Sequence, residues 1–147
     1  MWRTIALGLG CLGLTGCSGP SGGGGDGPAP AKDPLDVYEA VFRYRLQNHP
    51  RDVRAYLSVD GRDLSTDLLR RLHRDWPNLA PASEEPKEKG LRLSVSDLKW
   101  IDANTAEVHA GYWFPTKFAG EGYFADHRVV KKDGRWVVAS VSNEVMS

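Results

Sequence analysis

The chain has 147 residues, a length typical of one domain, and carries 19 Lys and Arg against 19 Asp and Glu. From residue 34 onward the count is 17 of each, so we expect no nucleic-acid partner and no polybasic membrane attachment, because both need concentrated positive charge. Both cysteines, Cys11 and Cys17, lie near the N-terminus. The rest of the chain therefore has no disulfide, thiolate metal site or cysteine nucleophile.

The first 16 residues have the pattern of an export signal. Arg3 supplies a positive start, and residues 4–14 form an apolar run of 11 residues. A membrane-spanning helix needs about 20 apolar residues, so this run is too short to cross a bilayer. A buried helix is the alternative interpretation, and the four glycines within residues 8–16 disfavour it.

The sequence Leu14-Thr15-Gly16-Cys17 resembles the lipobox of bacterial lipoproteins. The resemblance implies that residues 1–16 are removed, that a diacylglyceryl group is attached to the Cys17 sulfur, and that the new amino group takes a further acyl chain such as palmitate. Several chains on one residue would give durable anchoring, so membrane lipid is the first expected partner. Under the same resemblance, Ser18 favours the periplasmic face of the outer membrane if the host is Gram-negative.

Residues 17–33 comprise the lipidated cysteine and a linker rich in Gly, Pro and Ser, followed by a domain at 34–147. Asp33 and Pro34 predict the N-cap and first position of a helix that ends before Pro50. A short extended run is expected over 55–59 and a second helix over 65–75. Residues 77–90 are expected to be a loop, either a functional lid or, as we prefer, a surface excursion.

After residue 90 the apolar period changes to two, which predicts strands over 91–101, 105–114, 121–132 and 135 to about 145. A break in parity predicts a bulge at Ser96-Asp97, and Asp133-Gly134 predicts a hairpin. The expected fold class is α+β, with two N-terminal helices packed on a curved four-stranded antiparallel meander. This order, with its closing Arg135-Trp136-Val137-Val138 strand, is similar to the nuclear-transport-factor-2-like (NTF2-like, cystatin-like) superfamily of cone-shaped folds. That superfamily includes enzymes, binding modules and scaffolds, so the resemblance concerns fold and not function.

Strand register predicts which side chains share the concave, helix-facing side of the sheet. A two-residue turn at 133–134 places His127 opposite Ser140. Tyr112 and Tyr123 fall on the same face, so these four residues are candidate ligand-binding groups in an otherwise apolar cone. The alternative is that His127 and Ser140 form a satisfied core pair.

A turn centred near residues 117–118 would place His109 opposite Asp126 on the other face. This pair could act as an oriented general base, or it could be a solvated cross-strand contact. The four histidines have no spacing typical of a metal site, and no cofactor motif is found, so neither a metal nor a cofactor is expected. Trp113 points outward on this face, which suggests a partner or homodimer surface.

Two functions follow from these patterns. The preferred one is a non-enzymatic envelope lipoprotein whose domain binds an envelope protein or a small ligand. The alternative is a small-molecule enzyme resembling the ketosteroid-isomerase-like branch of the superfamily, with His127 or the His109–Asp126 pair as its base. An enzyme of that kind would be favoured by a buried carboxylate deep in the cone, which the sequence does not reveal.

Overall fold

The structure, a computed structural model, describes residues 32–86, 90–115 and 120–147. The predicted signal segment, Cys17 and most of the linker therefore lie outside the described residues, as does the turn expected near residues 117–118. In the described part of the chain, no helix is long and apolar enough to cross a membrane.

Helix α1 (Pro34–Leu46) begins where the sequence predicts. The Asp33 carboxylate accepts a hydrogen bond from the Leu35 backbone N–H at 2.9 Å, which satisfies one of the donors exposed at a helix start. Pro34 fits the first turn because its missing N–H would have no partner there. One face of the helix is buried through Val37, Tyr38, Val41, Phe42 and Leu46.

Helix α2 (Thr66–His73) is shorter than the predicted range of 65–75. The Ser65 hydroxyl caps it by accepting a hydrogen bond from the Leu68 backbone N–H at 3.3 Å. Leu68 and Leu72 are its buried residues. Arg71 of α2 forms ion pairs with Asp36 and with Glu39 of α1, so the two helices are joined by charge as well as by packing.

The predicted meander is formed by β4 (Leu91–Asp102), β5 (Thr105–Pro115), β6 (Gly120–Lys132) and β7 (Arg135–Met146), which pair in sequence order and antiparallel. The predicted bulge in β4 is confirmed, because the register shifts between Ser96 and Lys99. Asp97 takes a positive φ of 56° at this point. The shift restores a single buried face to a strand whose sequence changes parity.

The prediction of a four-stranded sheet is wrong, because the sheet has seven strands in the order β2-β1-β4-β5-β6-β7, with β3 also paired to β1. β1 (Ala55–Val59) lies parallel to β4, whereas β2 (Arg62–Asp63) and β3 (Leu79–Pro81) are short additions beside β1. Part of the segment predicted as a loop therefore joins the sheet. Strands of two or three residues are too short to show an alternating pattern, and a parallel partner cannot be inferred from a hairpin turn.

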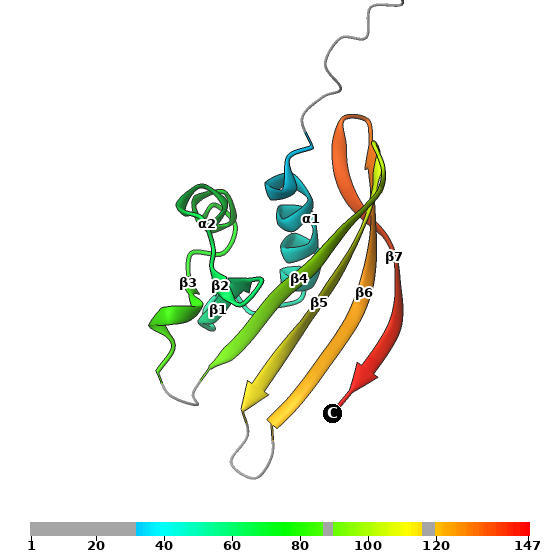
Figure 1. Cartoon of the computed structure of the whole chain (residues 1–147). Coiled ribbons are helices and arrows are strands. Elements are labelled where there is room, and N and C mark those ends of the chain that lie inside the picture. The colour runs from blue at the N-terminus through cyan, green and yellow to red at the C-terminus, as the bar shows by residue number, and fades with distance from the viewer. Residues whose placement is uncertain (1–31, 87–89, 116–119) are drawn as a thin grey trace, which may run out of the picture. The chain divides into compact units, whose positions relative to one another are not determined.

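Both helices lie on one side of the sheet, and α1 contacts β4, β5, β6 and β7. The core between the two layers includes Phe42, Leu57, Val95, Val108 and Val129, none more than 1% exposed. Figure 1 shows that α1 covers only part of this face, and that the ends of β5, β6 and β7 near the C-terminus extend beyond the helices. The helix-facing side of the sheet thus has a covered part and an uncovered part.

Candidate functional site

Two of the four ligand-binding candidates meet near the end of the sheet that extends beyond the helices. Tyr112 of β5 and Tyr123 of β6 are direct cross-strand partners, and their rings stack with centroids 5.7 Å apart at an angle of 17°. Because side chains alternate along a strand, Tyr112 shares the helix-facing side with the core residues Val108 and Ala110. Tyr112 is nevertheless 39% exposed, so the stacked pair forms an accessible aromatic surface.

The third candidate, His127, lies further along β6 on the same face and is fully buried. Its Nδ1 lies 3.0 Å from the Ala125 carbonyl oxygen, which can only accept, so Nδ1 carries the proton. The other ring nitrogen, Nε2, is buried without a hydrogen-bond partner among the described residues. Burial, reinforced by the positive charge of Arg45, lowers the pKa of His127 to about 4. The imidazole is therefore neutral at pH 7.

Arg45, near the end of α1, completes this group of side chains and was not among the predicted residues. Its guanidinium carbon lies 4.4 Å from the ring centroid of Tyr123 and 5.9 Å from that of Tyr44. Tyr44 in turn meets the ring of His127 edge-on at 5.9 Å. We call Tyr44, Arg45, Tyr112, Tyr123 and His127 the tyrosine–arginine site. An arginine in the last turn of an amphipathic helix usually indicates a solvated side chain, so the sequence carried no signal for its role.

The fourth candidate, Ser140, does not belong to this site, and its predicted pairing with His127 is wrong. His127 pairs with Val141, whereas the exposed Ser140 pairs with Arg128. The cause is a shift of register between Arg128 and Val129, which inserts one extra residue into β7. The predicted cross-strand pairs between the 133–134 turn and this shift, including Val129 with Val138, are confirmed.

The predicted contact between His109 and Asp126 is confirmed, with His109 Nδ1 and Asp126 Oδ1 at 2.8 Å. Asn143 also donates its side-chain amide to Asp126 at 2.6 Å. These two hydrogen bonds, the one from Asn143 first, lower the pKa of Asp126. The pair lies on the sheet face opposite the helices, where the His109 ring stacks on Phe124 with centroids 6.0 Å apart. It is therefore separated from the tyrosine–arginine site by the thickness of the sheet.

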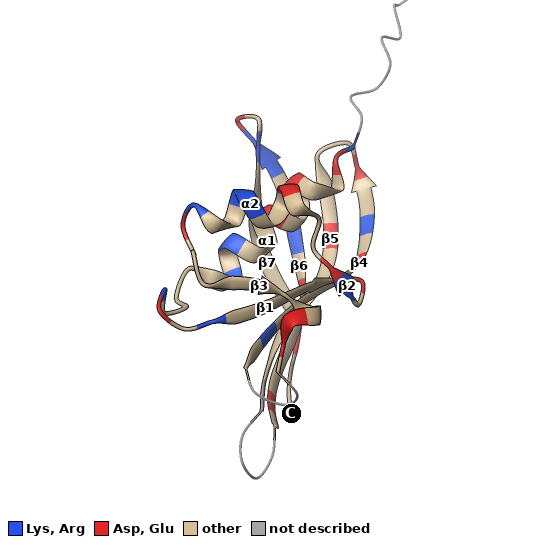
Figure 2. Ribbon diagram, turned by 90° about the vertical axis from the view of Figure 1, so that its left-hand side faces the viewer, with Lys and Arg blue, Asp and Glu red and all other residues tan. Residues whose placement is uncertain are grey.

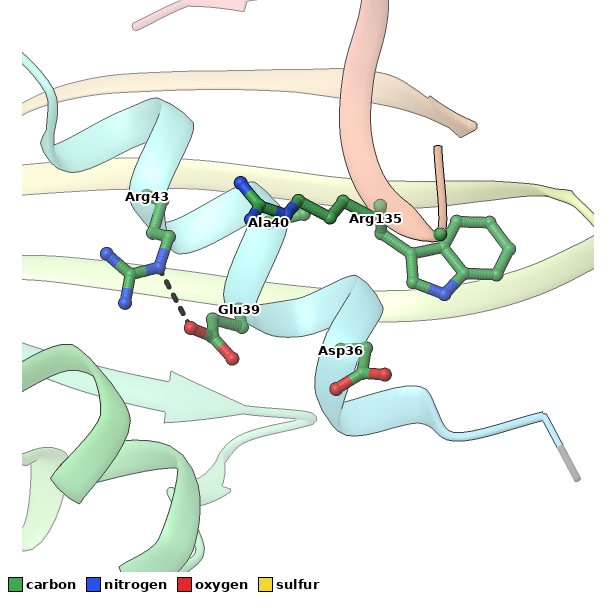
Figure 3. A pocket seen from close by; sticks show the side chains of 7 residues that line it. Asp36, Glu39, Ala40, Arg43 and Arg135 are labelled. Atoms are coloured by element: carbon green, nitrogen blue, oxygen red, sulfur yellow. Dashed lines mark hydrogen bonds and ion pairs between the residues drawn. The ribbon is translucent and has the colours of Figure 1, made fainter. Parts of the chain in front are cut away.

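A separate cleft of about 450 Å³ lies between α1 and the start of β7 (Figure 3). Its charged walls are largely neutralised within the protein, because Arg43 is paired with Glu39, and Arg71 joins both Glu39 and Asp36. The apolar part of its wall is formed by Ala40 and Trp136. Most of its charges thus have partners, although Arg135, which also lines the cleft, forms no ion pair with a described residue.

Charge and metal-ligand chemistry give no other candidate in the described ranges. Figure 2 shows Lys and Arg interspersed with Asp and Glu over the surface of the domain. Among the residues that the structure describes, there is no group of three or more His, Cys, Asp or Glu side chains placed to hold a metal ion. The tyrosine–arginine site is consequently the best-defined collection of polar groups without partners.

Comparison with known proteins gives no family assignment. No protein-family model matches the chain, and no curated protein matches it. Among solved structures, it is similar to an NTF-2 like protein of unknown function from Shewanella oneidensis MR-1, with 16% sequence identity and a TM-score of 0.33. The match covers 73% of this chain and 89% of the other chain. A likeness of this extent carries no argument about fold or function.

Proposed function

We propose that this chain is a lipid-anchored binding module of the bacterial cell envelope, built on an NTF2-like domain. The Leu14-Thr15-Gly16-Cys17 pattern behind an apolar segment of signal length supports the anchor. Two helices packed on one face of a curved, mainly antiparallel sheet support the domain type. The observation that carries the binding role is the accessible Tyr112–Tyr123 pair, which lies beside polar groups that are buried without partners.

A small ligand is the occupant that this site favours. Stacked aromatic rings offer a flat apolar surface, and a nearby guanidinium and imidazole offer directional hydrogen bonds. Sites of this composition orient a ligand through a few polar groups while burying its apolar part.

An envelope protein or a second copy of the chain is the other candidate occupant. Phe114 is 45% exposed and Met146 is 79% exposed at the same end of the sheet, where Met146 pairs with Tyr123. Together with Tyr112 these side chains form an exposed apolar border next to the site, and such borders are common at protein interfaces.

The enzymatic alternative gains less support. A histidine with a pKa of about 4 is a weak base at neutral pH, and the His127 ring is fully buried. The forces that set its pKa include no carboxylate, so His127 lacks the orienting acid of a catalytic base. The His109–Asp126 pair has that partner, but it lies on the sheet face away from the tyrosine–arginine site.

The anchor is tested by Cys17→Ser in the full chain, followed by separation of membrane and soluble fractions. We expect the variant to leave the membrane fraction, with Ser18→Ala as a matched control that stays there. Retention of Cys17→Ser in the membrane would refute the lipid anchor.

The binding role is tested by NMR screening of small aromatic compounds against the full chain in detergent. Shifts of the Tyr112 and Tyr123 ring signals are the expected result, and the Tyr112 shift should be lost in Tyr123→Ala. Shifts scattered over the surface, or none, would contradict a ligand site at this end of the sheet.

A further inference from the structure

Two arginines close together on α1 differ in how their charges are satisfied. Arg43 donates hydrogen bonds to Glu39, to Asp75 and to the Arg71 carbonyl oxygen. Arg45, two residues later, forms no ion pair with any residue in the described ranges. Its Nε and Nη2 atoms are buried and lack a hydrogen-bond acceptor in the part of the chain that the structure describes.

Leaving such donors unsatisfied is unfavourable. A buried polar group without a partner costs about 1–3 kcal/mol, and a charged group costs more. The rings of Tyr123 and Tyr44 attract the guanidinium through their faces, yet a ring face does not replace an acceptor for each N–H. Arg45 is therefore held in place with its hydrogen-bonding capacity largely unused.

The same position has an excess of positive charge. The charge of Arg45 is, after burial, one of the causes that lower the pKa of His127, and no carboxylate is among those causes. His127 Nε2, which carries no proton, is a buried acceptor without a donor. Two donor atoms of a cation and one acceptor of a neutral ring are thus left without partners among the described residues, and the cation belongs to Arg45.

The walls around these atoms are aromatic. Tyr123 stacks against Tyr112 on the sheet, and Tyr44 approaches His127 from the helix. A flat ligand could continue the stack of rings, whereas a branched aliphatic ligand would make poorer contact with them. An anionic group on such a ligand would find its partner in the Arg45 guanidinium.

We propose that the tyrosine–arginine site binds a small planar organic carboxylate. The carboxylate accepts hydrogen bonds from Arg45, and the planar part stacks on the tyrosine rings. Guanidinium and carboxylate match in geometry, because two parallel N–H···O bonds can form between them. This inference rests on the proposed function, since it specifies the ligand class of the same site.

The test compares 4-hydroxybenzoate with 4-hydroxybenzamide, its neutral counterpart of similar shape, on the full chain in detergent. Binding is followed through the NMR signals of the Arg45 Nε–Hε group and of the Tyr112 and Tyr123 rings. We expect the carboxylate to bind at least tenfold more tightly than the amide and to shift the Arg45 signal. Arg45→Gln should remove this preference, whereas Arg70→Gln, which removes an exposed positive charge from α2, should retain it.

Each outcome of the comparison is decisive. Equal affinity for the two compounds, with shifts at Tyr112 and Tyr123, would overturn the carboxylate proposal and leave the ligand site standing. Binding of neither compound would count against both proposals. A preference for the carboxylate that persists in Arg45→Gln would assign the anion to another part of the surface and would also overturn the inference.

Discussion

His127→Leu replaces the buried ring on β6 with an apolar side chain that does not titrate. In the folded protein the pKa of His127 is lowered from 6.5 to about 4, first by burial and then by the charge of Arg45. In the unfolded chain the ring regains the ordinary value. At a pH between the two pKa values, His127 is protonated in the unfolded state but not in the folded state. The free energy of unfolding therefore falls as the pH is lowered from about 6.5 to about 4.

The size of this effect follows from the two pKa values. Each pKa unit corresponds to 1.36 kcal/mol, so the interval from 6.5 to about 4 gives a loss of about 3 kcal/mol on acidification. The protein has its full stability at a pH above the pKa of the unfolded state. The stability that is lost on acidification does not return at a pH below the pKa of the folded state. Because a small domain has a total stability of about 5–15 kcal/mol, a loss of this size is readily measured.

The assay is urea unfolding monitored by tryptophan fluorescence at pH 7 and pH 4, for the wild-type protein and for His127→Leu. The other titrating groups, including Asp126, are present in both proteins, so their contributions largely cancel in the difference. We expect the stability of the wild type relative to the variant to fall by about 3 kcal/mol between the two pH values. A difference that stays constant within 1 kcal/mol would refute the argument that His127 is buried in its neutral form.

Two further predictions concern local packing and capping. Gly111→Ala should lower the free energy of unfolding by about 1–3 kcal/mol, because the new Cβ would overlap the Tyr123 carbonyl oxygen and lie 2.9 Å from the Phe124 Cα. Thermal unfolding measures the effect, and an unchanged Tm would mean that β5 and β6 are not in such close contact. Asp33→Ala should cost about 1 kcal/mol, because the Leu35 N–H loses its acceptor, whereas Asp33→Asn should retain most of the stability. Equal losses in the two variants would contradict a capping role for this side chain.

The long elements of the fold could be predicted because their signals are local and repeated. The cap of α1 depends on Asp33 and Pro34 alone, and the bulge in β4 is visible as a change of parity around Ser96 and Asp97. The pairing of His109 with Asp126 followed from placing opposite charges and apolar residues across one hairpin. In these cases neighbouring residues determine the local geometry.

The prediction was wrong where geometry depends on distant or very short segments. Ser140 does not pair with His127, because β7 contains an extra residue at the register shift. The shift lies in a stretch of small and β-branched side chains, where either register keeps apolar residues facing the core. Arg45 was missed because its partners, Tyr44 and Tyr123, come from different layers of the structure. Only the packing of α1 on the sheet shows that this guanidinium is buried.

Strand β7 forms one edge of the sheet and is 12 residues long. A regular edge of this length would invite the edge strand of another molecule, which matters greatly for proteins concentrated on a surface. β7 avoids a regular edge through two irregularities of register, and near the second of them Asn143 adopts a positive φ of 52°. Its unpaired backbone groups therefore do not form a continuous ladder. If the chain is tethered among many copies on a membrane, as proposed, this irregular edge would keep neighbouring molecules from joining their sheets.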